Sequence, residues 1–163
     1  MKNLYIVRHA KSDWSNGELA DKQRPLNARG LKDAPFMAEQ FVKRAGVPEL
    51  FLSSPAVRAR TTCGFFARAA GVPESDIIIE EQLYFGSPES IVAMLQPYAL
   101  KHNSIILFGH NPTHSNLAYL LCPDFLDDMP TCAIVAISFA DSIAAGKGKL
   151  MWYDYPKRYG KEN

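Results

Sequence analysis

The feature that most constrains this chain is a short apolar run near its start, Leu4-Tyr5-Ile6-Val7, which ends in Arg8 and His9. Four successive apolar residues that favour β structure predict a strand buried on both faces, as in a parallel sheet. Arg8 and His9 would then lie at the carboxyl end of this strand. In open α/β sheets, ligands bind at that edge.

Apolar runs of the same kind recur along the chain. They cover residues 50–53, 76–79 and 104–108, and two further strands are predicted over residues 133–139 and 149–153. Helical segments follow each of the first four runs, and three of these segments begin with a capping residue followed by proline: Ser54-Pro55, Ser87-Pro88 and Asn111-Pro112. Ser and Asn suit the N-cap, and proline suits the first helical position. This alternation predicts an α/β fold with a mostly parallel sheet.

Prolines and glycines set the expected bounds of the helices. Asn27 is expected to cap a helix that ends at Gly46. Pro35 should kink or restart that helix, because its ring removes a backbone hydrogen bond. Pro97 should end or kink a later helix in the same way. Residues 11–25 show little periodicity and are expected to form a loop over the end of the first strand.

Composition limits the class of protein. The chain has 163 residues, of which 47% are hydrophobic and 21% are charged, and this predicts one globular domain over residues 1–163. A net charge of +1 predicts no general affinity for nucleic acid or for an anionic membrane. No apolar run approaches the roughly 20 residues of a membrane span, and Met1-Lys2-Asn3 leads into a short predicted strand rather than the apolar core of a signal peptide. We therefore expect a cytoplasmic protein.

Several residues that bind metals elsewhere are expected to have structural roles here. The three cysteines are odd in number and lack a Cys-x-x-Cys spacing, so we expect buried thiols at Cys63, Cys122 and Cys132. His110 and His114 are four residues apart, but no third ligand follows at a suitable spacing. The acidic loop 123–131 lacks the spacing of an EF-hand. Aromatic and basic residues alternate over 153–161, where a docked C-terminus is favoured over binding of single-stranded nucleic acid.

Three strand-to-helix junctions carry the residues with the clearest chemistry. Arg8 and His9 follow the first strand, Arg58 falls in the first turn of the helix after the second, and His110 follows the fourth. These residues should converge at one edge of the sheet. Two guanidiniums and a cationic His110 would hold phosphoryl oxygens while His9 attacks phosphorus in line. The pattern predicts a covalent phosphohistidine, with no metal. Arg60 and Arg68 are expected to be solvated.

The same residues carry a resemblance to a known family. Arg8-His9, the stretch from Ser54-Pro55 through Arg58-Ala59 to Thr61-Thr62, and Gly109-His110 resemble the histidine phosphatase superfamily, over most of the chain. Arg24-Pro25-Leu26 to Arg29-Gly30 and Gly109-His110-Asn111-Pro112 are similar to its SixA-type phosphohistidine phosphatases.

The resemblance has implications for fold and mechanism. It implies a three-layer, phosphoglycerate mutase-like sandwich, in which helices flank a six-stranded, mostly parallel sheet. It also implies that His9 is the nucleophile, that Arg8, Arg58 and His110 bind the phosphoryl group, and that Arg24 contributes to substrate binding. No cofactor or metal is implied.

One departure from the family bears on the substrate. Many members carry a proton-donating Glu two residues after a Leu, whereas Leu83 is followed here by Tyr84 and Phe85. Without an acid, an alkoxide leaves slowly, whereas the conjugate acid of imidazole has a pKa of about 6.5 and imidazole leaves readily. This favours a phosphoramidate substrate, although Asp13 or Glu89 remains a candidate acid.

Three functions are consistent with the sequence. The leading one is a phosphohistidine phosphatase whose partner is a protein that carries phosphohistidine. The second is a phosphatase or mutase that acts on small phosphate esters. The third is a module that binds a phospholigand without turnover, but His9 argues against it, because binding alone has no need of a nucleophile.

Overall fold

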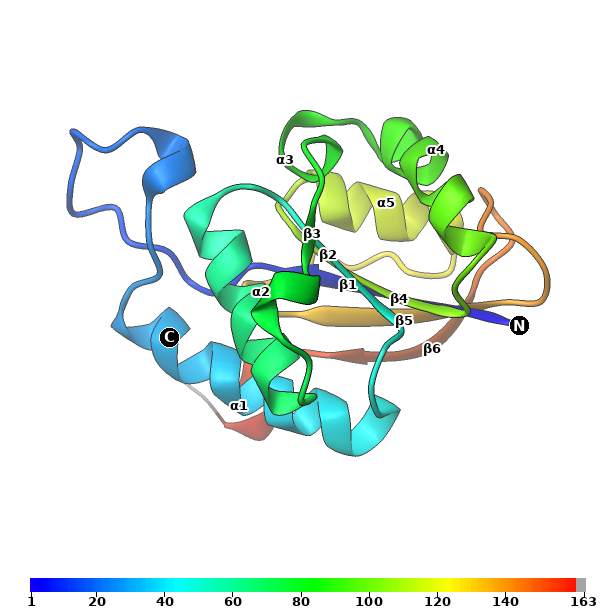
Figure 1. The fold of residues 1–163 in the computed structure, drawn as a ribbon, viewed down its shortest axis with the longest axis horizontal. Coiled ribbons are helices and arrows are strands. Elements are labelled where there is room, and N and C mark those ends of the chain that lie inside the picture. Colours follow the sequence, from blue (N-terminus) through cyan, green and yellow to red (C-terminus); the bar gives the residue numbers. More distant parts are fainter. Residues whose placement is uncertain (161–163) are drawn as a thin grey trace.

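The computed structural model describes residues 1–160 and contains a six-stranded sheet in the order β3-β2-β4-β1-β5-β6 (Figure 1). The strands are β1 Lys2–Arg8, β2 Leu50–Ser53, β3 Ile78–Ile79, β4 Ser104–Gly109, β5 Ile134–Phe139 and β6 Lys149–Asp154. The pairs β1–β4, β2–β4 and β2–β3 are parallel, whereas β1–β5 and β5–β6 are antiparallel. The predicted mostly parallel, six-stranded sheet is confirmed.

Helices cover both faces of this sheet, which gives three layers. The longer helices are α1 Ala28–Ala45, α2 Val57–Ala69, α4 Pro88–Ala99 and α5 Thr113–Leu121. The shorter ones are α3 Gln82–Phe85 and the 3-10 turns η1 Asp21–Gln23, η2 Glu74–Asp76 and η3 Pro156–Tyr159. Figure 1 shows α1 and α2 on one side of the sheet and α4 and α5 on the other.

The central strands are apolar throughout because each of their faces joins a different core. In β1, Leu4 and Ile6 pack in a cluster with residues of α4 and α5. Tyr5 and Val7 point the other way and pack with residues of α1 and α2. Successive side chains of a strand alternate between faces, so a strand covered on both sides needs an unbroken apolar run.

Pro35 and Pro97 lie inside helices, so the predicted restart at Pro35 and the predicted helix end at Pro97 do not occur. Helix α1 begins after its cap Asn27 as expected, but it runs through Pro35 without restarting and ends before Gly46. One missing backbone hydrogen bond is offset by the burial of the helix face that carries Met37 and Phe41. Helix α4 likewise continues past Pro97 for two residues.

Helices α2 and α5 each begin later along the chain than predicted. The N-cap of α2 is Ala56 and that of α5 is Pro112, so neither Ser54 nor Asn111 occupies the N-cap position of the helix that follows it. Ser54 Oγ instead accepts a hydrogen bond from the Ala56 N–H at 3.1 Å, and Asn111 Oδ1 accepts one from the Ser115 N–H at 3.1 Å. Both polar side chains are thereby held at the carboxyl edge of the sheet.

The third strand is shorter than expected. Residues 76–79 were expected to form it, but Asp76 ends η2 and only Ile78 and Ile79 pair with β2. These two side chains are 37% and 41% exposed, because β3 lies at the edge of the sheet. An edge strand has one unpaired side and requires less apolar character than a central strand.

The cysteines and the C-terminal segment agree with expectation. The three thiols are free and buried. The Tyr159 hydroxyl donates to Asp154 Oδ2 at 2.6 Å, and its ring packs against Phe36, so η3 is docked against the body of the protein. No helix in the described part of the chain has the length and apolar character needed to span a bilayer.

Candidate active site

The predicted residues meet at the carboxyl edge of the sheet because β4 lies between β1 and β2. Arg8 ends β1 and is followed by His9, Arg58 lies in the first turn of α2, and His110 follows β4. The ring centroids of His9 and His110 are 5.0 Å apart. His9 and Arg58 are buried, with 7% and 5% of their surfaces exposed. Arg24, in the segment between β1 and α1, is buried beside them with 6% of its surface exposed.

One ring nitrogen of His9 has no hydrogen-bond partner among the described residues. Nδ1 lies 2.7 Å from the carbonyl oxygen of Ala10 and donates its proton there, so Nε2 carries the lone pair. Burial is the main cause that lowers the pKa of His9, to about 3, and the charges of Arg58 and Arg8 lower it further. The imidazole is therefore neutral near pH 7, which is the form that attacks phosphorus.

His110 is also neutral in the ligand-free protein. Its Nε2 lies 2.8 Å from Ser54 Oγ, and its Nδ1 is buried without a hydrogen-bond partner in the described residues. Burial lowers the pKa of His110 to about 2, with further contributions from His9 and Arg58. The neutral form of His110 is therefore favoured in the ligand-free protein, and the predicted cationic form concerns the site with a phosphoryl group bound.

Asp21, on η1, holds two of the three arginines of the site, Arg24 and Arg58. Arg58 Nη1 donates to the Asp21 backbone oxygen at 2.7 Å, and Arg58 Nη2 donates to Asp21 Oδ2 at 3.0 Å. Arg24 Nε donates to Asp21 Oδ1 at 3.3 Å. These contacts use the Nη edge of Arg58 and leave its Nε buried without a partner within residues 1–160. An unpaired buried donor is costly, so the Nε–H group is suited to an anion.

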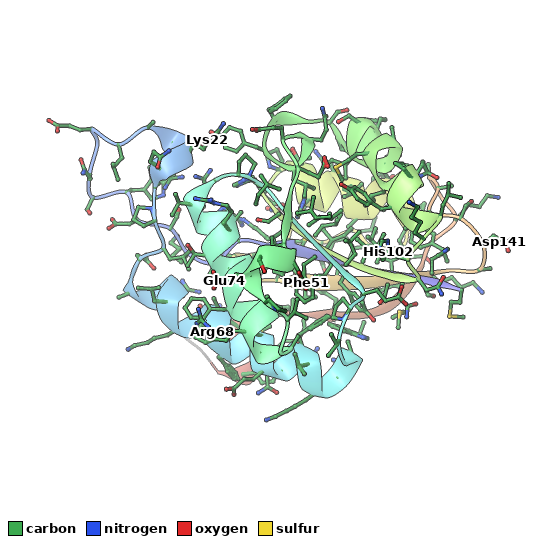
Figure 2. The ribbon with its side chains drawn as sticks, in the orientation of Figure 1. Lys22, Phe51, Arg68, Glu74, His102 and Asp141 are labelled. Atoms are coloured by element: carbon green, nitrogen blue, oxygen red, sulfur yellow. The ribbon has the colours of Figure 1, made fainter. Side chains whose placement is uncertain are left out.

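Tyr84, from α3, completes this cluster. Its hydroxyl donates to Asp21 Oδ2 at 2.7 Å, and its ring lies edge-on to His110 with centroids 5.5 Å apart. The hydrogen bond from Tyr84 is the largest cause that lowers the pKa of Asp21, to about 2, and Arg58 and Arg24 add to it. Lys22, labelled on η1 in Figure 2, lies 3.9 Å from Glu81 and ties the same two segments together.

Arg8 and Arg24 are fixed by contacts at the two ends of the site. Arg8 Nη1 donates to the Met129 carbonyl oxygen at 2.8 Å, and its Nε is buried without a partner in the described part of the chain. Arg24 Nη1 donates to Ser12 Oγ at 2.9 Å, and its guanidinium lies 3.4 Å from the centroid of the Trp14 ring. Both cations are therefore held in place before any ligand binds.

Four residues of this cluster were not predicted from the sequence to be site residues: Asp21, Ser54, Thr62 and Tyr84. Thr62 Oγ1 accepts a hydrogen bond from the Ala10 N–H at 3.1 Å and donates to the Arg58 carbonyl oxygen at 2.8 Å. It thereby joins the segment after His9 to α2. The available signals were the spacing of three between Asp21 and Arg24 and the spacing of four between Arg58 and Thr62.

Neither candidate acid, Asp13 or Glu89, has the environment that a proton donor requires. Asp13 Oδ1 accepts a hydrogen bond from the Ser15 N–H at 2.7 Å, and hydrogen bonding to Ser15 lowers the pKa of Asp13. Glu89 is exposed and has no polar partner among residues 1–160. Phe85, the residue at the position of the expected acid, is 67% exposed, whereas its neighbour Tyr84 contacts the site.

The remaining candidates lie outside the cluster. His114 is fully buried, and its Nδ1 lies 3.0 Å from the Val7 carbonyl oxygen. Within residues 1–160, no group of three His, Cys, Asp or Glu side chains is placed to hold a metal ion. Arg60 is exposed, and Arg68 pairs with Glu74 at 3.2 Å on the outside of α2.

Comparison with known proteins identifies the family. The model of the histidine phosphatase superfamily (branch 1) matches residues 4–84. An uncharacterised protein of Mycobacterium tuberculosis is 32% identical over 117 residues, which are 71% of this chain and 69% of that protein. The chain belongs to the histidine phosphatase superfamily. A chloroplastic protein of Arabidopsis thaliana is 31% identical over 133 residues, and the match spans 74% of this chain but only 59% of the plant protein.

Solved structures place the chain with the SixA type of this superfamily. The protein histidine phosphatase SixA complexed with tungstate is 25% identical, with a TM-score of 0.85 over 96% of this chain and 99% of the other. A SixA structure from Agrobacterium tumefaciens is 27% identical, with a TM-score of 0.80 over 95% and 98%. A mycobacterial glucosyl-3-phosphoglycerate phosphatase shares the fold at 17% identity, with a TM-score of 0.71 over 96% and 100%.

Proposed function

We propose that this protein is a phosphohistidine phosphatase that uses His9 as its nucleophile. His9 Nε2 attacks the phosphorus of the substrate, a bond from phosphorus to His9 forms, and the bond to the substrate imidazole breaks. The leaving nitrogen takes a proton from solvent. Water then attacks phosphorus, the bond to His9 breaks, and inorganic phosphate leaves.

The other residues stabilise charge on the phosphoryl oxygens. Arg8 and Arg58 offer Nε–H donors that are buried without a partner in the described residues, and Arg24 adds a third guanidinium. His110 is neutral before binding, and a bound dianion would raise its pKa and favour the protonated ring. Positioned donors of this kind supply most of the catalysis that phosphoryl transfer requires.

The proposed substrate class follows from the ionisation of the carboxylates at the site. Asp21 lies against the arginines, but its pKa of about 2 keeps it ionised near neutral pH. Asp13 is shifted in the same direction. An ionised carboxylate has no proton to give to a leaving alkoxide, whereas imidazole requires little help. The site therefore supports a phosphoramidate substrate, and a protein that carries phosphohistidine is the proposed partner.

The test is a comparison of leaving groups on one preparation. We expect a phosphohistidine protein and esters of acidic phenols to be cleaved faster than alkyl esters by about 10²–10⁴ in kcat/KM, which is the usual contribution of a general acid. Phe85→Glu should raise alkyl-ester cleavage selectively. Efficient alkyl-ester hydrolysis by the wild type, lost in Asp13→Asn or Glu89→Gln, would instead identify an ester phosphatase.

A phospholigand-binding module is the third possibility, and one measurement separates it from both enzymes. A nucleophilic His9 forms a phosphorus–nitrogen bond, which is labile in acid and stable in base. We expect rapid-quench experiments with labelled substrate to trap label on the wild-type chain and not on His9→Ala. A chain that binds phosphate and never acquires label would be a binding module.

A further inference from the structure

A basic groove adjoins the proposed phosphoryl site. Its volume is about 510 Å³, within the range of small-molecule sites. Its lining residues are Arg8, Lys11, Asn27, Arg29, Pro130 and Thr131. Arg8 borders both places, because its buried, unpartnered Nε is one of the proposed phosphoryl donors and its side chain also lines the groove. A molecule with its phosphoryl group at His9 therefore has this groove beside it.

The charges of the groove are of one sign. Three of its six lining residues are cationic, and none is a carboxylate. Lys11 is exposed, and its side chain has no polar partner within residues 1–160. Arg29 uses its Nε to contact Asp33 Oδ2 at 3.3 Å, so its Nη groups stay available. Two carboxylates act on these cations from outside the lining, Asp33 on Arg29 and Asp128 on Arg8, so the three cations leave the groove with an excess of positive charge.

Backbone contacts hold the groove open in a fixed shape. The Lys11 carbonyl oxygen accepts from the Asn27 N–H at 3.0 Å, and a Cβ on Gly30 would lie 2.2 Å from that oxygen. The start of α1 therefore abuts the loop after His9. On the other wall, the Cys132 N–H donates to the carbonyl oxygens of both Arg8 and His9 at 3.0 Å.

Cys132 adopts a φ of 63°, a conformation that non-glycine residues rarely occupy. Such a conformation persists only where the surroundings hold it. Here it turns Pro130 and Thr131 back against the end of β1. The cationic side chains therefore face a preformed groove rather than a loop that must order on binding.

We propose that this groove is a second anion subsite, which binds a carboxylate or a further phosphate group of the molecule whose phosphoryl group lies at His9. The proposal rests on the proposed function, because it takes His9 as the site of phosphoryl transfer. Lys11 and Arg29 recognise the second anion, and Arg8 lies between the two groups. Substrates with an anionic group near the phosphoryl group are then preferred over those without one.

Non-hydrolysable ligands test the subsite without turnover. The ligands are phosphonoacetate, 3-phosphonopropionate and 4-phosphonobutyrate, each compared by calorimetry with the alkylphosphonate of the same length. For the best length, we expect the carboxylate to tighten binding about tenfold, the effect of one charge-assisted contact. Lys11→Gln should remove this preference, and Lys11→Glu should reverse it. Lys43→Gln, an exposed lysine near the other end of α1, should retain it.

The outcomes separate the subsite from the proposed function. Equal binding of carboxylate and alkyl ligands by the wild type at every length would overturn the subsite, as would a preference that survives in Lys11→Glu. Hydrolysis of phosphoimidazole, which carries no second anion, is measured in parallel. Cleavage of phosphoimidazole without a carboxylate preference in ligand binding supports the proposed phosphatase and rejects the subsite. A carboxylate preference without cleavage supports the anion subsite and rejects the phosphatase.

Discussion

The histidine side and the arginine side of the active site differ in how their charge is balanced. His9 and His110 lie with ring centroids 5.0 Å apart, and neither ring is hydrogen-bonded to a carboxylate within residues 1–160. Arg58 and Arg24 instead share Asp21, which is anchored by Tyr84. Burial without a counter-charge keeps an imidazole neutral and its lone pair available. A shared carboxylate keeps two guanidiniums together despite their repulsion.

The largest effect should come from the histidine side. His9→Ala removes the proposed nucleophile, and we expect turnover to fall by roughly four or more orders of magnitude. Binding of vanadate should remain measurable by calorimetry, because Arg8, Arg58 and His110 keep their donors. Turnover by the purified variant above one part in a thousand would contradict the assignment of His9 as the nucleophile.

Arg58→Ala should have the next largest effect and a different signature. A charge-assisted contact to phosphate serves both the ground state and the transition state, so vanadate affinity and kcat/KM should fall together. We expect a loss of about 10²–10³ in kcat/KM. Arg60→Ala, the exposed neighbour on α2, is the matched control. A change in thermal stability alone would reduce Arg58 to a structural role.

The histidine side also predicts sensitivity to acid. The pKa of His9 is about 3 and that of His110 is about 2, and outside the site the buried His114 has a pKa of about 4, all below the unfolded value of about 6.5. The unfolded chain then binds more protons, so stability is complete above pH 6.5 and is lost as the pH falls toward these values. Each ring should contribute a loss of about 1.4 kcal/mol per pH unit in that window.

Urea unfolding at several pH values measures this dependence. His9→Ala removes one of the titrating rings, so its free energy of unfolding should fall less steeply between pH 6.5 and pH 4. A wild-type stability that is flat over this window would show that the imidazoles are already charged in the folded protein, and the contrast between the two sides of the site would fail.

On the arginine side, Asp21→Asn should produce a smaller loss, on the order of tenfold in kcat/KM. The amide still accepts a hydrogen bond from Arg58, but it no longer compensates the charges of Arg58 and Arg24. We expect the loss to appear mainly in kcat, since the arginines lose their fixed orientation and keep their attraction for phosphate. Glu81→Gln, which breaks only the exposed pair with Lys22, is the control. Equal kinetics in the two variants would remove Asp21 from the site.

Chelation should have no effect at all. The proposed charge on the phosphoryl oxygens is balanced by guanidiniums, and no divalent ion is needed to polarise them. Activity after dialysis against EDTA should equal that of the untreated protein. A loss that one added metal restores would point instead to the pair of His110 and His114.

The sequence predicted the sheet edge well because its signals are local. An apolar run followed by Arg8 and His9, or by Gly109 and His110, marks a strand and its carboxyl end within a few residues. Asp21 on η1 and Tyr84 on α3 were missed because their contact joins positions 63 apart, across short segments without periodicity. Only the three-dimensional path of the loop over α2 brings that carboxylate to Arg58.

The errors at the junctions have a common physical cause. Ser54 and Asn111 have the composition of N-caps, but each lies two or more residues before its helix and bonds across the site. A side chain that can cap a helix can equally bind another loop, and local preference does not decide between the two. The tertiary contact of Ser54 with His110 is stronger evidence of its role than its position before a proline.

The burial of the three cysteines affects how the protein responds to oxidants. Burial raises the pKa of the Cys63 and Cys132 thiols, and thiols that stay protonated and out of solvent react slowly with peroxide. Phosphatases that depend on a cysteine thiolate are silenced when that sulfur is oxidised. With the proposed nucleophile His9 and no accessible sulfhydryl among its described cysteines, the protein would keep removing phosphate during oxidative stress, when thiolate enzymes have stopped.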